Sequence, residues 1–261
     1  MSKSSWQATE VNRYVYWLAV ILLFLQALIV FTGASVRLTG SGLGCPNWPM
    51  CTDSSLTNTP EMGIHGFIEF GNRVLGVILG LYSLFVVIAL WPLRSTRSDL
   101  FRMAVLLFAV VPFQAILGGV TVRTQLNPWI VAAHFIPSAL AVALAAYMVK
   151  RTRDTGANPR PIASRTLATV AWAVGILCAI VVAMGVLVTG AGPHAGDKIS
   201  ARNGLNTLLM SRFHAIPVWL MTAGTIYGLV LARKEKLASA TRAFTFLPVS
   251  YTHLTLPTTP Y

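Results

Sequence analysis

Long apolar runs separated by short polar segments dominate this chain of 261 residues. A membrane-spanning helix needs about 20 mostly apolar residues, because each residue adds ~1.5 Å across a hydrocarbon core about 30 Å thick. Soluble domains rarely contain apolar helices of that length several times over. The pattern therefore predicts an all-α integral membrane protein, a polytopic helical bundle with six spans, at about residues 16–36, 65–92, 101–122, 129–149, 167–189 and 209–232.

The distribution of charge supports this class and predicts an orientation. Charged residues make up 11% of the chain, against roughly 25% in soluble domains. Fourteen of the 20 lysines and arginines flank the spans on the side of the N-terminus. Segments rich in Lys and Arg next to membrane spans are retained on the cytoplasmic side. We therefore expect a multi-pass protein of the cell membrane with a cytoplasmic N-terminus. The net charge of +12 then indicates contact with anionic lipid and not with nucleic acid.

The predicted outer side carries the longest ordered loop, at about residues 37–64. This loop is rich in Gly, Pro and Trp and contains Cys45 and Cys51. On an oxidising face two such cysteines can form a disulfide, which we expect here, with two free thiols as the alternative. Cys178 falls inside the fifth span, where a small packing residue is expected.

An internal repeat predicts two related halves. The fourth span carries His134-Phe-Ile-Pro and the sixth His214-Ala-Ile-Pro, and the first and fifth spans end in similar Thr-Gly-Ala segments. We therefore expect an N-terminal four-helix half over residues 1–150 and a partial second half over 151–248. Residues 249–261 are rich in Thr and Pro, so we expect a tail outside the fold and no role for its His253.

The start of the second span carries a polar stripe. At 100° per residue, Glu69 lies about 40° around the helix from His65, Asn72 lies about 20° on the other side, and Arg73 lies at the margin. Ionisable groups in a membrane helix are costly and face the bundle interior or a cavity. The stripe indicates either a functional site or a hydrogen-bonded packing patch.

Three histidines occupy similar positions on spans that run in the same direction. His134 is expected roughly 8 Å deep, His214 is at a similar depth and His65 is slightly shallower. Such histidines are typical of axial haem ligands in a helix bundle, although a single one can also be an ordinary hydrogen-bonded residue. The proline three residues after His134 and His214 removes a backbone donor and can kink the helix.

Several motifs in order resemble the haem A synthase family: TGASVRLTGSGLGCPNWPMC, EFGNR, LGGVTVRTQLNPWIVAAH, VTGAGPHAGD and RFHAIP, over about residues 13–235. The resemblance implies eight helices in two four-helix halves, of which six are found here. It implies substrate haem O in the first half and a haem B cofactor in the second, with oxidation of the C8 methyl group of haem O to a formyl group. Haem O synthase and an electron donor are the implied partners.

The resemblance also assigns residues. It implies that His134 and His214 are axial iron ligands in the first and second halves, that Glu69 is the catalytic acid residue, and that Cys45 and Cys51 form a loop disulfide. The expected haem-contacting set further includes His65, Asn72 and Arg73.

Two positions depart from the family pattern. Many members have a histidine where this chain has Asn72, and His65 lies seven residues away, roughly 10.5 Å along a helix. His65 therefore cannot simply take that place. The second ligand of the C-terminal half belongs to a helix that this sequence does not include.

Two other classes fit parts of the pattern. An electron-transfer cytochrome b subunit would usually carry two ligating histidines on one helix, and no span here does. A proton or cation transporter could use the stripe of His65 and Glu69, but it would need neither histidines at similar depths nor a cysteine loop. A haem absorption band would exclude the plain transporter.

Overall fold

The computed structural model describes residues 11–154, 163–193, 196–197 and 200–245. The predicted tail over 249–261, with His253, lies outside the described residues. Contacts divide the chain into two compact units. The first is Met1–Asn158 with Thr189–Leu205, and the second is Pro159–Val188 with Asn206–Tyr261.

All six predicted spans are helices, and each is long and apolar enough to cross a membrane. The polytopic helical fold is therefore confirmed. The helices are α1 (Arg13–Leu38), α2 (Gly63–Leu90), α3 (Ser98–Arg123), α4 (Pro128–Thr152), α5 (Arg165–Ala191) and α6 (Thr207–Lys234), with short 3-10 turns at Pro60–Met62 and Trp91–Leu93.

Side-chain caps set several of the helix starts. Asn12, Asn127 and Asn206 each accept a hydrogen bond from a backbone N–H in the first turn of α1, α4 and α6 respectively. These bonds satisfy donors that the first turn leaves without an intrahelical partner. Consequently α1 begins three residues before its predicted span, α6 begins two residues before it, and α4 begins one residue before it.

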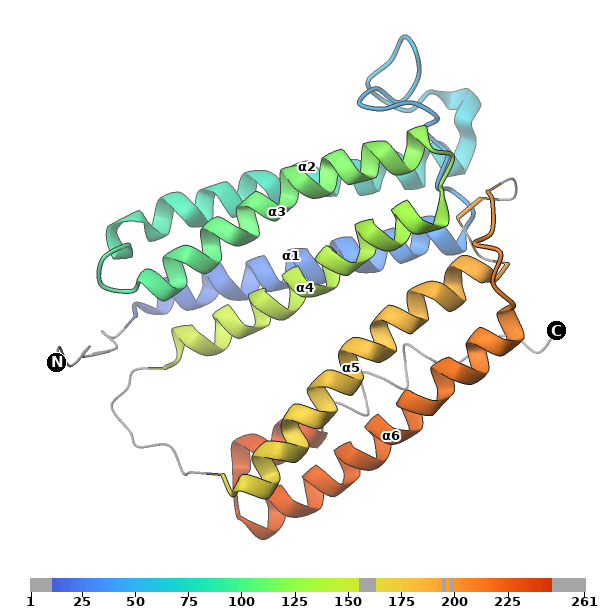
Figure 1. The fold of residues 1–261 in the computed structure, drawn as a ribbon. Coiled ribbons are helices and arrows are strands. Elements are labelled where there is room, and N and C mark those ends of the chain that lie inside the picture. Colours follow the sequence, from blue (N-terminus) through green and yellow to red (C-terminus); the bar gives the residue numbers. More distant parts are fainter. Residues whose placement is uncertain (1–10, 155–162, 194–195, 198–199, 246–261) are drawn as a thin grey trace, which may run out of the picture. The chain divides into compact units, whose positions relative to one another are not determined.

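The first unit is an up-and-down four-helix bundle (Figure 1). Each helix contacts the next in sequence, and α1 also contacts α4, so that the four helices close into a square. Short connections between antiparallel helices favour this arrangement. It brings the end of α1 and the start of α2 to the same end as the α3–α4 turn; we call this the Cys45 end.

Apolar packing is concentrated away from the Cys45 end. The buried cluster draws on the first half of α1, the second half of α2, the first half of α3 and the second half of α4, with Leu22, Val86, Leu90, Leu107 and Met148 fully buried. An ion network covers this opposite end: Asp99 contacts Arg97 at 3.1 Å and Arg151 at 2.8 Å.

The second unit contains α5, α6 and the helical residues 238–245, which share one apolar cluster. Phe244 packs its ring against Gly228 of α6. Glu235, just after α6, accepts hydrogen bonds from the hydroxyl and the backbone N–H of Ser164, and these bonds lower the pKa of its carboxyl group.

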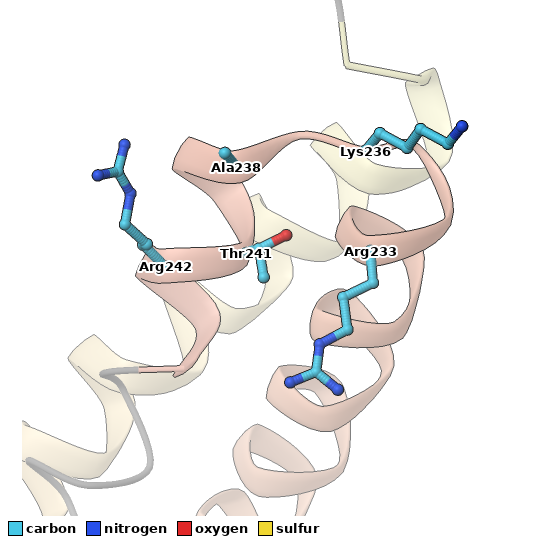
Figure 2. A pocket seen from close by; sticks show the side chains of 5 residues that line it. All are labelled: Arg233, Lys236, Ala238, Thr241 and Arg242. Atoms are coloured by element: carbon cyan, nitrogen blue, oxygen red, sulfur yellow. The ribbon is translucent and has the colours of Figure 1, made fainter.

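An open hollow of about 570 Å³ lies beside the end of α6, lined by Arg233, Lys236, Ala238, Thr241 and Arg242. Figure 2 shows the three cationic side chains of this hollow pointing away from one another. They therefore do not converge on a common ligand.

Candidate functional site

Glu69 is the buried carboxyl group at the Cys45 end. It lies in the second turn of α2 and is only 6% exposed. Its Oε2 accepts a hydrogen bond of 2.6 Å from the backbone N–H of Cys45, and its Oε1 lies 2.6 Å from the Arg73 guanidinium one turn further along α2. Both carboxyl oxygens are thus held, one by the loop that follows α1 and one by α2 itself.

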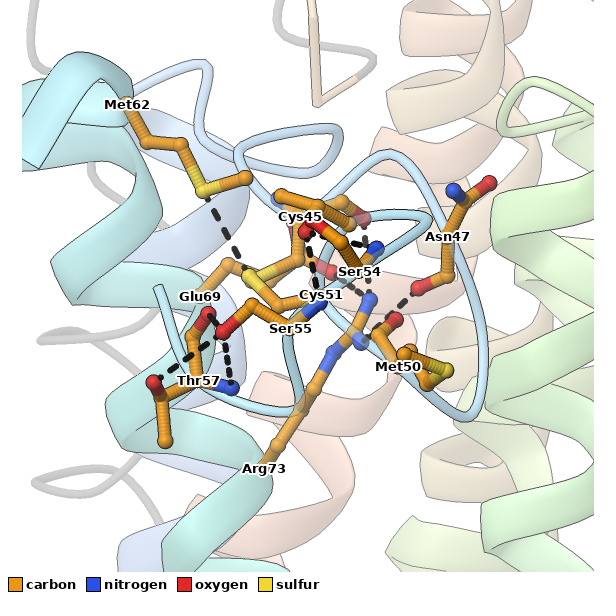
Figure 3. The surroundings of a disulfide bond; sticks show 11 residues. Cys45, Asn47, Met50, Cys51, Ser54, Ser55, Thr57, Met62, Glu69 and Arg73 are labelled. Carbon is orange, nitrogen blue, oxygen red and sulfur yellow. Dashed lines mark hydrogen bonds and ion pairs between the residues drawn. A yellow bond between two sulfur atoms is a disulfide. The ribbon is translucent and has the colours of Figure 1, made fainter. Parts of the chain in front are cut away.

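Arg73 joins Glu69 to that loop. Figure 3 shows its side chain extending from α2 into the coil of the loop. The guanidinium donates to the carbonyl oxygens of Cys45 and Asn47 at 2.9 Å and of Met50 at 3.2 Å. Arginine suits this position because its planar group presents several donors in a fixed geometry.

The loop closes on itself through sulfur. Cys45 and Cys51 are joined in a disulfide with their Cα atoms 4.5 Å apart, and both side chains are fully buried. The Sδ atom of Met62 lies 3.5 Å from the Sγ atom of Cys51. We call residues 45–51 the cysteine loop. It holds the three carbonyl groups that Arg73 contacts.

Trp48, within the cysteine loop, lies against α3. Its ring occupies the space where a Cβ atom on Gly119 would be. Arg123, at the end of α3, places its guanidinium 5.8 Å from the centre of the ring and donates to the Trp48 carbonyl at 3.2 Å. The cysteine loop is therefore held on two sides, by α2 through Arg73 and by α3 through Trp48.

Two other residues of the predicted stripe, His65 and Asn72, are bonded to neighbours other than Glu69. His65 lies two residues into α2 and is exposed, and its Nδ1 is 2.8 Å from the buried hydroxyl of Ser41. Asn72 accepts a hydrogen bond of 2.7 Å from Thr32 of α1. Only Arg73 shares the contacts of Glu69, so the stripe divides among three different neighbours.

His134 presents a buried imidazole nitrogen near the Cys45 end of α4. It lies in the second turn of α4, and its Nδ1 is buried with no hydrogen-bond partner in the described structure. Its ring packs beside α3 where Gly118 has no side chain, 3.5 Å from the position of a Cβ atom. Gln114 donates to the His134 carbonyl at 2.8 Å and to the Ser138 hydroxyl, and so fixes the backbone of this turn.

His214 shows the same arrangement within the second unit. Its Nδ1 is also buried and has no partner among the described residues. The preceding helix again provides a glycine: a Cβ atom on Gly185 would lie 3.4 Å from the ring. A proline follows three residues later inside α6, as it does inside α4.

Either of these two imidazoles could ligate haem iron. A buried imidazole nitrogen without a partner needs a proton acceptor, a donor or a metal, since leaving it unpaired is costly. The described residues include no group of three or more His, Cys, Asp or Glu side chains able to enclose a metal ion. A single imidazole suffices for haem iron, because the porphyrin supplies the other nitrogen ligands.

Sequence reasoning did not identify Ser41, Thr32, Gln114 or Trp48, which contact the candidate residues. The helical glycines 118, 119 and 185 carried a partial signal, because glycine in a helix interior often marks close approach of another group. Trp48 lies in the loop singled out for its composition, but nothing in the sequence indicated the helix against which it packs.

Comparison with known proteins gives a consistent family assignment. The model of the cytochrome oxidase assembly protein family (COX15-CtaA) matches residues 16–224. The curated relatives include heme A synthases of Lysinibacillus sphaericus, 24% identical over 58% of this chain and 48% of the relative, and of Listeria monocytogenes, 30% identical over 45% and 38%. The chain thus spans less than half the length of these relatives. No solved structure matches it.

Proposed function

The chain belongs to the cytochrome oxidase assembly protein family, and from that membership we propose that it takes part in haem A biosynthesis by oxidising the C8 methyl group of haem O to a formyl group. The relatives that carry the name heme A synthase support the pathway. The observation that carries the proposal is the buried Glu69–Arg73 pair beneath the cysteine loop, in the same four-helix bundle as His134.

In this proposal the two units have different tasks. His134 would hold the iron of haem O in the first unit, where the glycine of α3 leaves room beside its ring. His214 would hold haem B in the second unit. Haem, when bound, supplies the oxidative chemistry, and the protein supplies position and electrostatics.

Glu69 is the residue proposed to act on the reacting carbon. Its carboxyl group can accept a proton at Oε2 or Oε1, or stabilise positive charge that develops on the carbon. Burial strengthens either effect, because the local dielectric constant is low. The contacts to Cys45 and Arg73 keep the group in one orientation, so that little reorganisation is needed during the reaction.

Asn72 and His65 receive no ligand role in this proposal. Asn72 stands where many members of the family have a histidine, and here it is hydrogen-bonded to Thr32 of α1. Among the described histidines of the first unit, His134 is the one with a buried ring nitrogen that has no hydrogen-bond partner. Partners proposed from the family are the lipid bilayer, a haem O synthase that delivers the substrate, and an electron donor.

The test is to express the chain in a bacterial strain that makes haem O but lacks its own haem A synthase. Total haem is then extracted and separated by chromatography. Haem A, or hydroxylated haem O, would support the proposal. Purified protein that contains haem yet leaves haem O unchanged, with a haem O synthase and the respiratory chain present, would contradict it.

A further inference from the structure

We propose that Trp48 and Gly119 are positioning residues for Glu69, and that they act through the cysteine loop. This inference rests on the proposed function for its catalytic consequence, but its structural part can be measured without haem. Neither residue contacts Glu69. The connection runs from α3 through the Trp48 ring to the loop backbone, and from there to the carboxyl group.

The first step is the contact with α3. Gly119 is buried, and a Cβ atom built on it would meet the Cδ2, Cε2 and Cε3 atoms of the Trp48 ring closer than real Cβ atoms approach other atoms. The indole belongs to a loop closed by a disulfide, so it cannot move aside as the end of a flexible side chain can. Glycine at 119 is therefore what allows the indole to pack against the backbone of α3.

The second step fixes the ring in place. Arg123 lies one turn beyond Gly119 on α3, with its guanidinium over the indole and a hydrogen bond to the Trp48 carbonyl. The same residue thus holds both the side chain and the backbone of Trp48. Such cation–π contacts add modestly to the packing.

The third step transmits this placement to Glu69. Trp48 lies between Asn47 and Met50, whose carbonyl groups accept from Arg73, and three residues after Cys45, whose N–H donates to Glu69. The disulfide closes residues 45–51 into a short ring, which limits independent movement of these groups. If the Trp48 ring moves away from α3, the backbone groups of the cysteine loop shift relative to the side chains of Glu69 and Arg73 on α2 (Figure 3).

The experiment measures how readily the disulfide is reduced in the purified chain. Both sulfur atoms are buried, so reduction by dithiothreitol requires the cysteine loop to open. Free thiols are then counted by the mass added with a maleimide. We expect Gly119→Ala to accelerate reduction about tenfold or more, because overpacking of this kind is costly.

Gly33→Ala is the matched control. Gly33 also lies in a helix of the first unit, but a Cβ atom there would have no neighbour within 4 Å. It therefore reports the general effect of exchanging a helical glycine for alanine, which alone favours the helix. We expect it to leave the reduction rate unchanged.

A double-mutant cycle tests whether the two residues act together. Trp48→Ala should also accelerate reduction, and adding Gly119→Ala should change it no further, because the new Cβ atom no longer meets an indole. Trp48→Phe keeps an aromatic ring and should restore much of the protection. Independent, multiplicative effects of the two alanine substitutions would overturn the proposed contact, as would a wild-type rate in Gly119→Ala.

The catalytic consequence is read from the conversion of haem O by the same variants. Gly119→Ala and Trp48→Ala should keep bound haem but convert it about tenfold more slowly, with Trp48→Phe recovering activity. Faster reduction of the disulfide combined with wild-type conversion would overturn the positioning role. A wild-type chain that makes no haem A would count against the proposed function, while the reduction rates would still decide the contact between Trp48 and Gly119.

Discussion

Glu69 differs from the other acidic residues of the described chain in being held at both oxygens while almost fully buried. We expect Glu69→Gln to retain bound haem but to lower conversion of haem O by roughly 100-fold or more, the usual effect of losing a general acid–base group. Chromatography of extracted haem measures this. Glu61→Gln changes an exposed carboxyl group near the same loop and should behave as wild type; wild-type conversion by Glu69→Gln would exclude the catalytic role.

The histidines yield a second prediction at this scale. Because the Nδ1 atoms of His134 and His214 are buried without a partner in the described structure, replacing either by alanine should reduce the haem bound in its own unit. His65 is exposed and bonded to Ser41, so His65→Ala should keep the full amount. The absorption spectrum of the pyridine complex quantifies haem in each variant. Full haem content in both the His134 and His214 variants would show that neither is a ligand.

Candidate site residues could be predicted from the sequence, but the residues that contact them could not. Helical periodicity placed His65, Glu69 and Asn72 on one stripe, and the structure divides that stripe among Ser41, the cysteine loop and Thr32. Helical periodicity shows which side of a helix is polar. It does not show which other element packs against that side. Long-range contacts of this kind depend on how loops and helices pack, which one sequence does not specify.

At the scale of helices, length and hydropathy were sufficient. Every predicted span is present, and the ends differ by at most three residues because polar caps such as Asn12 and Asn206 extend the apolar runs. The reason is physical: in lipid, each backbone polar group must be bonded within its own helix, so an apolar run of this length has few alternatives. The square packing of α1 to α4 and the two-sided attachment of the cysteine loop were not predicted.

The ion network that closes the end of the first bundle opposite Cys45 gives a prediction for stability. Asp99 joins Arg97, at the start of α3, to Arg151, near the end of α4, and the Arg97 side chain is 3% exposed. Asp99→Ala should therefore destabilise the protein by roughly 3 kcal/mol, since removing one partner of a largely buried ion pair is costly. Thermal unfolding in detergent measures the loss. Arg102→Ala, which removes exposed hydrogen bonds to Ser98, should change the melting temperature little.

For the whole molecule, the two units show one local arrangement twice: a histidine in the second turn or just beyond, a proline three residues later, and a glycine on the preceding helix. The sequence repeat predicted the histidine and the proline. The pairing of each glycine with its histidine became recognisable only from the structure, because Gly118 and Gly185 lie at different distances in sequence from their histidines. Two sites built alike are consistent with binding two similar ligands, as the proposed substrate and cofactor are.

The orientation of the whole chain connects its charges to its cysteines. Basic residues cluster in the connections α2–α3 and α4–α5 and after α6, so these should lie in the cytoplasm and the cysteine loop on the opposite, oxidising side. Single cysteines introduced as Leu56→Cys and Ser95→Cys, in a Cys178→Ala background, test this, because both positions are exposed. A maleimide that cannot cross the cytoplasmic membrane should label position 56 in intact spheroplasts. It should label position 95 only after the spheroplasts are lysed. The reverse labelling would place Cys45 and Cys51 in the reducing cytoplasm, where a stable disulfide and the proposed attachment of Glu69 to a closed loop would both be untenable.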